Sequence, residues 1–364
     1  MTPRTLLIAT AMAASALAQG ARAQSVSPVV GFPAAEPGIQ LGVSACYAGR
    51  IGQWIVAAGG CNFPTPGNKK YYAGIYAARA SEHALRWKRV GTLPRAAAYG
   101  ATVASGDSLI LIGGADAEGG MNTTLSLHLN ADGTEVSVHT LAPLPQTVDN
   151  AAAALSGHHV YVVGGNQGGM PSRQVLRCRL GSGRMEWSRV QPMPGAPRVQ
   201  PVSAACGGKV YVWGGFHAAA DSSRVHTAGV CLDTATGEWH ATSAPRAADG
   251  RELTLAGGAA WTCGSRIYAT GGVDKDIFLD AISGSYRLVE PSAYAYQPIG
   301  WYRFSPLLLT FDTRRQAWLP AGFASASLAR AGAAAVPVPD MGCFYIGGEV
   351  KPTLRTPQIV LIKP

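Results

Sequence analysis

The chain has 364 residues, of which 14% are charged, and its 30 Lys and Arg against 21 Asp and Glu give a formal net charge of +9. The basic residues are scattered along the chain, whereas nucleic-acid-binding proteins concentrate them in a stripe or patch. This distribution argues against a nucleic-acid partner, whereas the modest positive surplus fits a small acidic ligand better.

The first 23 residues have the pattern of a secretory signal peptide. Arg4 gives a positive start, residues 6–18 form an apolar stretch too short to span a bilayer, and residues 21–23 (Ala-Arg-Ala) match a small-x-small cleavage site. No other long apolar run follows. We therefore expect an exported, periplasmic protein without a membrane anchor, with residues 24–364 as its mature chain.

Six times along the chain, a short apolar run ends in a pair of glycines. The pairs are Gly59-Gly60, Gly113-Gly114, Gly164-Gly165, Gly214-Gly215, Gly271-Gly272 and Gly347-Gly348, at intervals of 54, 51, 50, 57 and 76 residues. A period near 50, with one buried strand and its glycines in each repeat, is typical of kelch β-propellers. The sequence predicts an all-β, single-domain, six-bladed kelch propeller with four-stranded antiparallel blades.

The fourth repeat illustrates the expected blade. Residues 199–205 read as the inner strand, 209–213 as a buried second strand, 224–232 as the third, and 238–242 as the outer strand. The outer strand contains a tryptophan that we expect to pack between blades. The tryptophans at this place are Trp87, Trp187, Trp239 and Trp318.

Two further elements depart from this pattern. The fifth repeat contains a long aromatic-rich excursion, about residues 279–304, which is equally consistent with a lid or sugar-stacking wall and with a packed surface flap. The last repeat ends after its third strand, near residues 357–362. Residues 26–30, near the mature N-terminus, are predicted to supply its outer strand and to close the ring.

The topology of such blades predicts where polar groups converge. In a four-stranded meander, the loop after strand two and the link to the next blade leave on the same face, so they gather at one mouth of the central channel. Polar residues in the loops are Asn62, Lys69, Lys70, Asn166, Arg173, His217, Asp274, Lys275, Glu349, Lys351 and Arg355. Those in the links are Arg95, Tyr99, Gln146, Arg198, Gln200, Arg246 and Glu252.

The seven cysteines have no metal-ligand spacing. We expect them to be small buried residues, although export permits a disulfide. Neither a metal nor another cofactor is indicated.

The final loop, residues 347–356, reads Gly-Gly-Glu-Val-Lys-Pro-Thr-Leu-Arg-Thr. It resembles the G-E-x-K-P-x-L-R-T segment of the kelch-type N-acetylneuraminate (sialic acid) mutarotases, or epimerases. Similar segments are residues 58–64 with 69–72, 98–100 (Ala-Tyr-Gly), 194–198 (Pro-Gly-Ala-Pro-Arg) and 270–278. Their order is rotated, as in the form called cyclically permuted mutarotase. One departure is Asp274, where the family more often has Asn.

The resemblance implies a mutarotase that interconverts the α and β anomers of sialic acid by acid/base-catalysed ring opening, with no cofactor. It implies Glu349 as the general base. An Arg grips a carboxylate with two parallel hydrogen bonds, and Arg355 and Arg198 are the candidates for the substrate's carboxylate, with Lys351 beside them. Candidates for the hydroxyls or acetamido group are Asn62, Tyr99 and Asp274. The group that protonates the ring oxygen, the preferred sialic acid derivative and the oligomeric state stay open.

Each of these roles has a structural alternative. Arg355 is also placed to form an ion pair with Glu349, six residues away in the same loop, and Asn62, Tyr99 and Asp274 are equally consistent with loop hydrogen bonds. The whole chain is open to a second interpretation as a non-catalytic kelch propeller that binds a carbohydrate or protein partner. A glycosidase would pair Glu349 with a second carboxylate such as Asp274. A copper oxidase would need a Tyr/His constellation that the spacing of His217 and His226 does not support.

Overall fold

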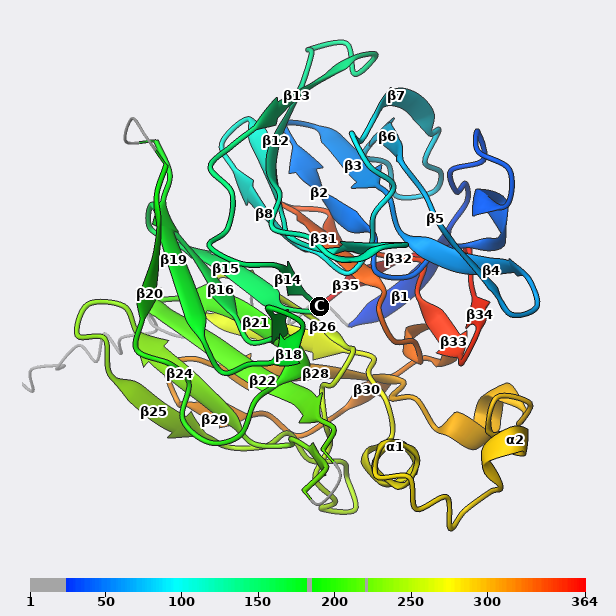
Figure 1. The fold of residues 1–364 in the computed structure, drawn as a ribbon, viewed down its shortest axis with the longest axis vertical. Helices are drawn as coiled ribbons and strands as arrows, with labels where there is room; N and C mark the ends of the chain where they lie inside the picture. The colour runs from blue at the N-terminus through cyan, green and yellow to red at the C-terminus, as the bar shows by residue number, and fades with distance from the viewer. Residues whose placement is uncertain (1–23, 182–184, 220–221) are drawn as a thin grey trace, which may run out of the picture.

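The computed structural model describes residues 24–181, 185–219 and 222–364, so the predicted signal segment, residues 1–23, lies outside it. Within these ranges the chain forms six antiparallel sheets, each built on a meander of four strands that pair in succession, and two of them carry a fifth, short strand beside this path. The sheets follow one another around a common centre (Figure 1). This all-β arrangement is consistent with a β-propeller.

The first three sheets are built from consecutive segments of the chain. The first contains β2 (Tyr47–Ile51), β3 (Trp54–Ala58), β6 (Gly74–Arg79) and β7 (Lys88–Thr92). The second contains β8 (Ala101–Ser105), β9 (Ser108–Ile112), β12 (Thr124–Leu129) and β13 (Val136–Thr140). The third contains β15 (Ala152–Ser156), β16 (His159–Val163), β19 (Val175–Arg179) and β20 (Trp187–Val190).

The next two sheets follow the same plan, and the last takes one strand from the other end of the chain. The fourth contains β21 (Val199–Cys206), β22 (Lys209–His217), β24 (Gly229–Asp233) and β25 (Trp239–Thr242). The fifth contains β26 (Ala259–Cys263), β27 (Arg266–Thr270), β28 (Leu307–Asp312) and β29 (Ala317–Trp318). The sixth contains β31 (Ala334–Val338), β32 (Gly342–Ile346), β35 (Ile359–Lys363) and β1 (Ser25–Val29).

Shorter elements lie in the loops between these strands. Small pairings are made by β4 (Cys61–Thr65) with β5 (Asn68–Tyr71), β10 (Ala115–Asp116) with β11 (Gly119–Gly120), and β33 (Glu349–Lys351) with β34 (Leu354–Arg355). The remaining short strands are β14 (Val148–Asp149), β17 (Asn166–Gln167), β18 (Met170–Pro171), β23 (Arg224–Val225) and β30 (Phe323–Ala324). The helices are α1 (Lys275–Ile282), α2 (Pro291–Tyr294), η1 (Ile39–Leu41), η2 (Ile299–Tyr302) and η3 (Ala326–Leu328). None of the described helices combines the length and the apolar character needed to cross a membrane.

The predicted N-terminal strand is confirmed. β1 pairs antiparallel with β35 from Ser25↔Lys363 to Val29↔Ile359, so the two ends of the described chain share one sheet. The repeat analysis is also confirmed for the fourth sheet except in its third strand. There the predicted strand is divided, because β23 pairs with the extended end of β22 and β24 begins only at Gly229. A Cβ at Gly229 would lie 2.2 Å from the Trp213 ring, which explains the glycine at this close contact.

The apolar side chains form cores between successive sheets, and the last of these cores joins the sixth sheet to the first. That core places Val336, Phe344 and Leu361 against Ile55 and Ala78. The four predicted tryptophans occupy such cores, as expected: Trp87 lies between the sixth and first sheets, Trp187 between the second and third, Trp239 between the third and fourth, and Trp318 between the fourth and fifth. Burial of these faces is the main source of stability for the arrangement.

Six residues at the inner ends of the sheets are joined by backbone hydrogen bonds in a closed cycle. We call them the ring residues: Ala45, Tyr99, Asn150, Gln200, Gly257 and Gly332. Each N–H donates to the carbonyl of the ring residue in the preceding sheet, over 2.7–3.0 Å, and the N–H of Ala45 donates to Gly332. All six have left-handed backbone conformations, with φ between 53° and 70°. The backbone itself therefore connects the sixth sheet to the first.

All seven cysteines are free thiols. Cys61, Cys178, Cys231 and Cys343 are buried, as expected for small core residues, but Cys46 and Cys206 are only partly buried and Cys263 is exposed. Cys263 ends β26, where the strand leaves the core, so the prediction of burial is wrong at this position.

A glycine substitution tests the contact between the sixth and first sheets. A Cβ on Gly347 (φ +61°) would lie 2.4 Å from the carbonyl oxygen of Val43, whereas one on Gly52 (φ +55°) meets nothing within 4 Å. Both alanines incur the left-handed strain of about 1–2 kcal/mol, and only Gly347→Ala adds overpacking of about 1–3 kcal/mol. Denaturant unfolding should show Gly347→Ala as the less stable variant by that margin. Equal losses would contradict the close approach.

Candidate functional site

A cavity of about 230 Å³ lies on the axis of the ring residues. All six ring residues line it, together with short neighbouring residues and two charged side chains. The full lining is Ser44, Ala45, Cys46, Tyr99, Gly100, Asn150, Ala151, Gln200, Pro201, Gly257, Gly258, Ala331, Gly332, Ala333, Glu349 and Arg355. Because every sheet contributes its inner end, the links gather at one mouth as the topology predicted.

The ring residues divide this cavity into two halves. Three neighbouring ring residues, Gly257, Gly332 and Ala45, are small, and the other three, Tyr99, Asn150 and Gln200, are polar. In the polar half, Gln200 donates to Asn150 (2.9 Å), and Asn150 donates to Asp149 (2.7 Å). The polar side chains are thus held in fixed orientations by one another.

The two charged residues come from the β33–β34 hairpin, which lies over the small half. Glu349 and Arg355 are register partners in this hairpin, and their side chains form an ion pair. The Glu349 backbone exchanges two hydrogen bonds with Ala331, next to the ring. Arg355 also donates to Ser44 Oγ (2.9 Å), and its guanidinium lies 5.0 Å from the Phe63 ring. The ion pair considered as an alternative for Arg355 is present, and both partners still line the cavity.

The surroundings of the Glu349 carboxyl change its pKa. Its side chain is 24% exposed and that of Arg355 only 5%. Burial raises the pKa of Glu349 above its ordinary 4.5, while the positive charges of Arg355 and Lys69 oppose the rise. A carboxyl whose pKa is moved toward neutrality beside a cation is typical of a general base.

Tyr99 faces the same cavity and has two unusual neighbours. The Cys61 thiol donates to its phenol oxygen (3.2 Å), and Lys69 Nζ lies 4.3 Å from its ring centroid. Burial raises the pKa of Tyr99 to about 12, the nearby thiol adds to the rise, and Lys69 opposes it. The structure therefore brings Tyr99 to the same cavity as Glu349 and Arg355, although the hairpin that carries the two charged residues lies about 250 positions later in the sequence.

Asn62 and Arg198 are placed elsewhere and are occupied by the protein itself. Asn62 donates to the carbonyls of Gly38 and Gly42 (2.8 Å each) and accepts from the Tyr72 hydroxyl (2.9 Å). Arg198 donates to the main-chain carbonyls of Gly214 (2.8 Å) and Ala228 (3.1 Å). Both side chains are buried, and neither is part of the cavity wall. Their contacts favour the structural alternative.

Lys351 connects the β33–β34 hairpin to the aromatic excursion. Its ammonium donates to the carbonyl of Gln297 (3.0 Å), and η2 packs against β33. Within the excursion, the Tyr294 ring makes edge contacts with Tyr302 (5.6 Å) and with Trp301 (5.9 Å). The excursion is therefore a packed aromatic cluster, and its η2 segment contacts β33, the strand that begins with Glu349. Figure 1 shows α1 and α2 outside the six sheets.

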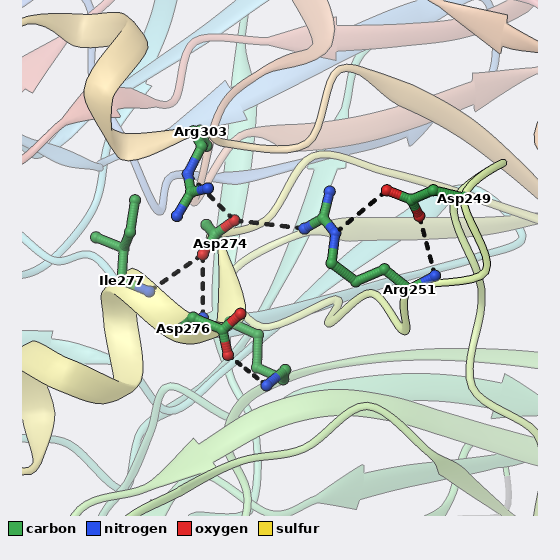
Figure 2. A network of polar contacts seen from close by, with 7 residues as sticks. Asp249, Arg251, Asp274, Asp276, Ile277 and Arg303 are labelled. Atoms are coloured by element: carbon green, nitrogen blue, oxygen red, sulfur yellow. Dashed lines mark hydrogen bonds and ion pairs between the residues drawn. The ribbon is translucent and has the colours of Figure 1, made fainter.

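Asp274 lies at the base of the excursion, in a second cavity of about 310 Å³ that it shares with Arg251, Lys275 and Arg303. It caps α1 by accepting from the backbone N–H groups of Asp276 (3.0 Å) and Ile277 (3.1 Å). Its other oxygen lies 3.6 Å from both Arg251 and Arg303 (Figure 2). Since Asp274 precedes the excursion and Arg303 lies near its end, this ion pair joins the two ends of the segment. The structure separates Asp274 from the cavity of Glu349.

Three residues around the main cavity were not selected as site residues from the sequence. Asn150 was not considered, and Gln200 and Lys69 were only two of many polar loop residues. A positional signal was present, because five ring residues stand 14 positions before the first glycine of their pair, and Gly332 stands 15 before Gly347. A comparison of the residues at this position in the six repeats identifies Tyr99, Asn150 and Gln200 together.

The chemistry available in the main cavity is proton transfer and anion binding. It combines a carboxylate, an arginine, a phenol and two amides. Among the described residues, no group of three or more His, Cys, Asp or Glu is arranged to hold a metal ion.

Comparison with known proteins identifies the relatives of this chain. A sequence profile described as N-acetylneuraminate epimerase matches residues 141–363. The N-acetylneuraminate epimerase of Pasteurella multocida (strain Pm70) is 29% identical over 229 residues, which cover 60% of this chain and 57% of the relative. The protein of the same name from Yersinia enterocolitica is 30% identical over 230 residues, covering 59% and 55%. The chain thus spans about half the length of the curated relatives it matches.

A solved structure titled "Structure of YjhT" is similar in fold as well as in sequence. It superposes with a TM-score of 0.51 at 26% identity, and the match covers 59% of this chain and 62% of that chain.

The Asp274 network predicts how the excursion is held. Asp274→Ala removes the α1 cap, at about 0.5–2 kcal/mol, and both ion pairs, whereas Asp274→Asn keeps a capping oxygen. Hydrogen exchange of residues 275–303 should accelerate most in Asp274→Ala and less in Asp274→Asn. Asp276→Asn, which alters an exposed carboxylate that pairs with the neighbouring Lys275, is the control. Equal exchange rates in all three variants would contradict the role of Asp274 in holding the excursion.

Proposed function

This chain belongs to the N-acetylneuraminate epimerase family, and from that premise we propose that it is a mutarotase that interconverts the α and β anomers of N-acetylneuraminate. The observation that carries the proposal is the Glu349–Arg355 pair, which two adjacent strands of one hairpin present to the central cavity. A sugar acid needs both an anion-binding group and a proton acceptor at its anomeric centre, and this pair supplies both.

In the proposed reaction, Glu349 accepts the proton of the anomeric hydroxyl as the ring opens. The C–O bond to the ring oxygen breaks, the anomeric carbon becomes a ketone, and rotation followed by reclosure gives the other anomer. Arg355 has two functions in this proposal. Its Nη1 pairs with Glu349 and favours the ionised carboxylate, and its Nε donates to Ser44, so the remaining N–H donors of the guanidinium are the ones offered to the substrate's carboxylate.

Other residues have supporting roles in this proposal. Asn150 and Gln200 offer amide groups to the substrate's hydroxyls or acetamido group from the polar half of the cavity. Lys351 and the aromatic cluster of the excursion form a wall beside Glu349. Of the substrate-binding residues predicted from sequence, Arg198 and Asn62 are assigned here to the framework, and Asp274 to the base of the excursion.

We also propose that the six sheets are the blades of one closed kelch propeller over residues 24–364. The cycle of ring hydrogen bonds and the pairing of β1 with β35 support this proposal. The proposed export to the periplasm rests only on the sequence of residues 1–23.

Replacement of the base tests the function directly. Freshly released α-N-acetylneuraminate is followed by proton NMR with the wild type, with Glu349→Gln and with Glu118→Gln, a control at an exposed surface ion pair. The wild type and the control should accelerate relaxation to the β anomer. Glu349→Gln should lose about 10²–10⁴-fold of the acceleration, as expected for a general base.

Other outcomes would favour different functions. If the wild type binds sialic acid but leaves the spontaneous rate unchanged, the chain is a non-catalytic carbohydrate-binding propeller. If it neither binds nor accelerates, N-acetylneuraminate is not its ligand.

The electrostatics of Glu349 predict the pH dependence. Activity needs the ionised carboxylate, so kcat/KM should rise with pH through a midpoint above 4.5, because burial raises the pKa of Glu349. Arg355 opposes that rise, so Arg355→Gln should move the midpoint further upward, in addition to raising KM. Profiles of both proteins between pH 4 and 8, corrected for the spontaneous reaction, check the shift. An unchanged or lower midpoint in Arg355→Gln would contradict this assignment.

A further inference from the structure

The ring opening proposed above requires a second proton-transfer group, one that gives a proton to the ring oxygen. Tyr99 is the phenol in the cavity of Glu349, and it reaches that cavity from the link between the first and second sheets. Its position is set by the backbone, since its N–H donates to Ala45 (2.9 Å) and its carbonyl accepts from Asn150 (2.8 Å). The side chain therefore projects from one of the most constrained points of the fold.

The hydrogen bonding of Tyr99 leaves its proton available. The phenol oxygen accepts from the Cys61 thiol, which directs one of its lone pairs toward the protein. In the part of the chain that the structure describes, no acceptor takes the phenol's own proton. A partly buried hydroxyl that lines a cavity, with a donor to its oxygen and no acceptor for its hydrogen, is free to donate to a ligand in that cavity.

Lys69 connects Tyr99 to Glu349 electrostatically. Its ammonium lies over the Tyr99 ring, where it stabilises negative charge on the phenol oxygen, and it also favours the ionised form of Glu349. Burial keeps Tyr99 protonated, with a pKa of about 12, while two cations favour ionisation of Glu349. Pairs of groups whose environments separate their protonation states in this way are characteristic of acid and base partners.

On the basis of the proposed mutarotase function, we propose that Tyr99 is the general acid that protonates the ring oxygen while Glu349 deprotonates the anomeric hydroxyl, with Lys69 stabilising the phenolate. In the opening step, the electrons of the O–H bond at the anomeric hydroxyl form the carbonyl, and those of the bond from the anomeric carbon to the ring oxygen take the proton of Tyr99. Reclosure reverses both transfers. No net proton is gained or lost, and no co-reactant is needed.

The test compares Tyr99→Phe with Tyr71→Phe by proton NMR of anomer exchange under saturating substrate. Phenylalanine keeps the ring and the left-handed backbone position, and Tyr71 is a matched control because it also lies near Lys69 (4.8 Å from the ring centroid) and stacks edge-on to Tyr99. We expect Tyr99→Phe to lose about 10²–10⁴-fold in kcat while the Kd for sialic acid changes only a few-fold. Tyr71→Phe should retain the wild-type kcat.

Two additional measurements separate acid catalysis from a positioning role. Lys69→Met should lower kcat by less than Tyr99→Phe, because the acid remains and only the stabilisation of its phenolate is lost. A difluorotyrosine at position 99, whose phenol is more acidic, should bring the alkaline loss of activity to lower pH.

The outcomes distinguish this proposal from the proposed function. An active wild type with a Tyr99→Phe variant of near-normal kcat would overturn the role of Tyr99 alone. A loss of kcat that only follows a matching loss of binding would also overturn it. A wild type that does not accelerate anomer exchange would overturn both.

Discussion

The cycle of backbone hydrogen bonds through the six ring residues is the constraint on which the other features of the structure depend. Each ring residue both donates to one neighbour and accepts from the other, so none of the six links can be shifted without stretching two hydrogen bonds. Because buried backbone groups need partners, this cycle determines how closely the sheets approach. It uses only main-chain atoms, so the ring side chains can differ among residues that tolerate the left-handed backbone. The fold can vary its chemistry at these positions without altering its geometry.

The repeat architecture could be predicted because it depends on local and periodic requirements. The glycine pairs mark places where the chain approaches a neighbouring sheet, as at Gly59, where a Cβ would lie 2.3 Å from the carbonyl oxygen of Ala97. The outer-strand tryptophans and the N-terminal strand follow from the need to cover apolar faces and open edges. The excursion was predicted only as an insertion, because its helices pack on side chains distant in sequence, such as Lys351.

The site was predicted less completely, for a physical reason. A polar residue beside a glycine-rich turn is as useful for satisfying main-chain carbonyls as for binding a ligand, and the sequence does not distinguish the two uses. Arg198 and Asn62 satisfy carbonyls, whereas Glu349 and Arg355 reach the cavity. Arg355 serves both the fold and the site. Its ion pair with Glu349 fixes the position of its side chain, and the same ion pair favours the ionised form of Glu349. Lys69 was one of many polar loop residues in the sequence and was not selected among them, because its importance depends on Tyr99, 30 positions later in the chain.

The division of the ring into a small half and a polar half has a consequence for selectivity. A framework of similar repeats around one axis offers a ligand on that axis several nearly equivalent orientations. If the lining were also symmetric, the ligand would bind in all of them. Here the sector with Gly257, Gly332 and Ala45 gives room to the charged hairpin, and the opposite sector presents the phenol and the amides. A ligand with an acidic end and a hydroxylated end is therefore expected to favour one orientation about the axis, with its acidic end toward the hairpin. In the proposed function, the irregularity of the repeats, rather than their regularity, orients the small molecule at their centre.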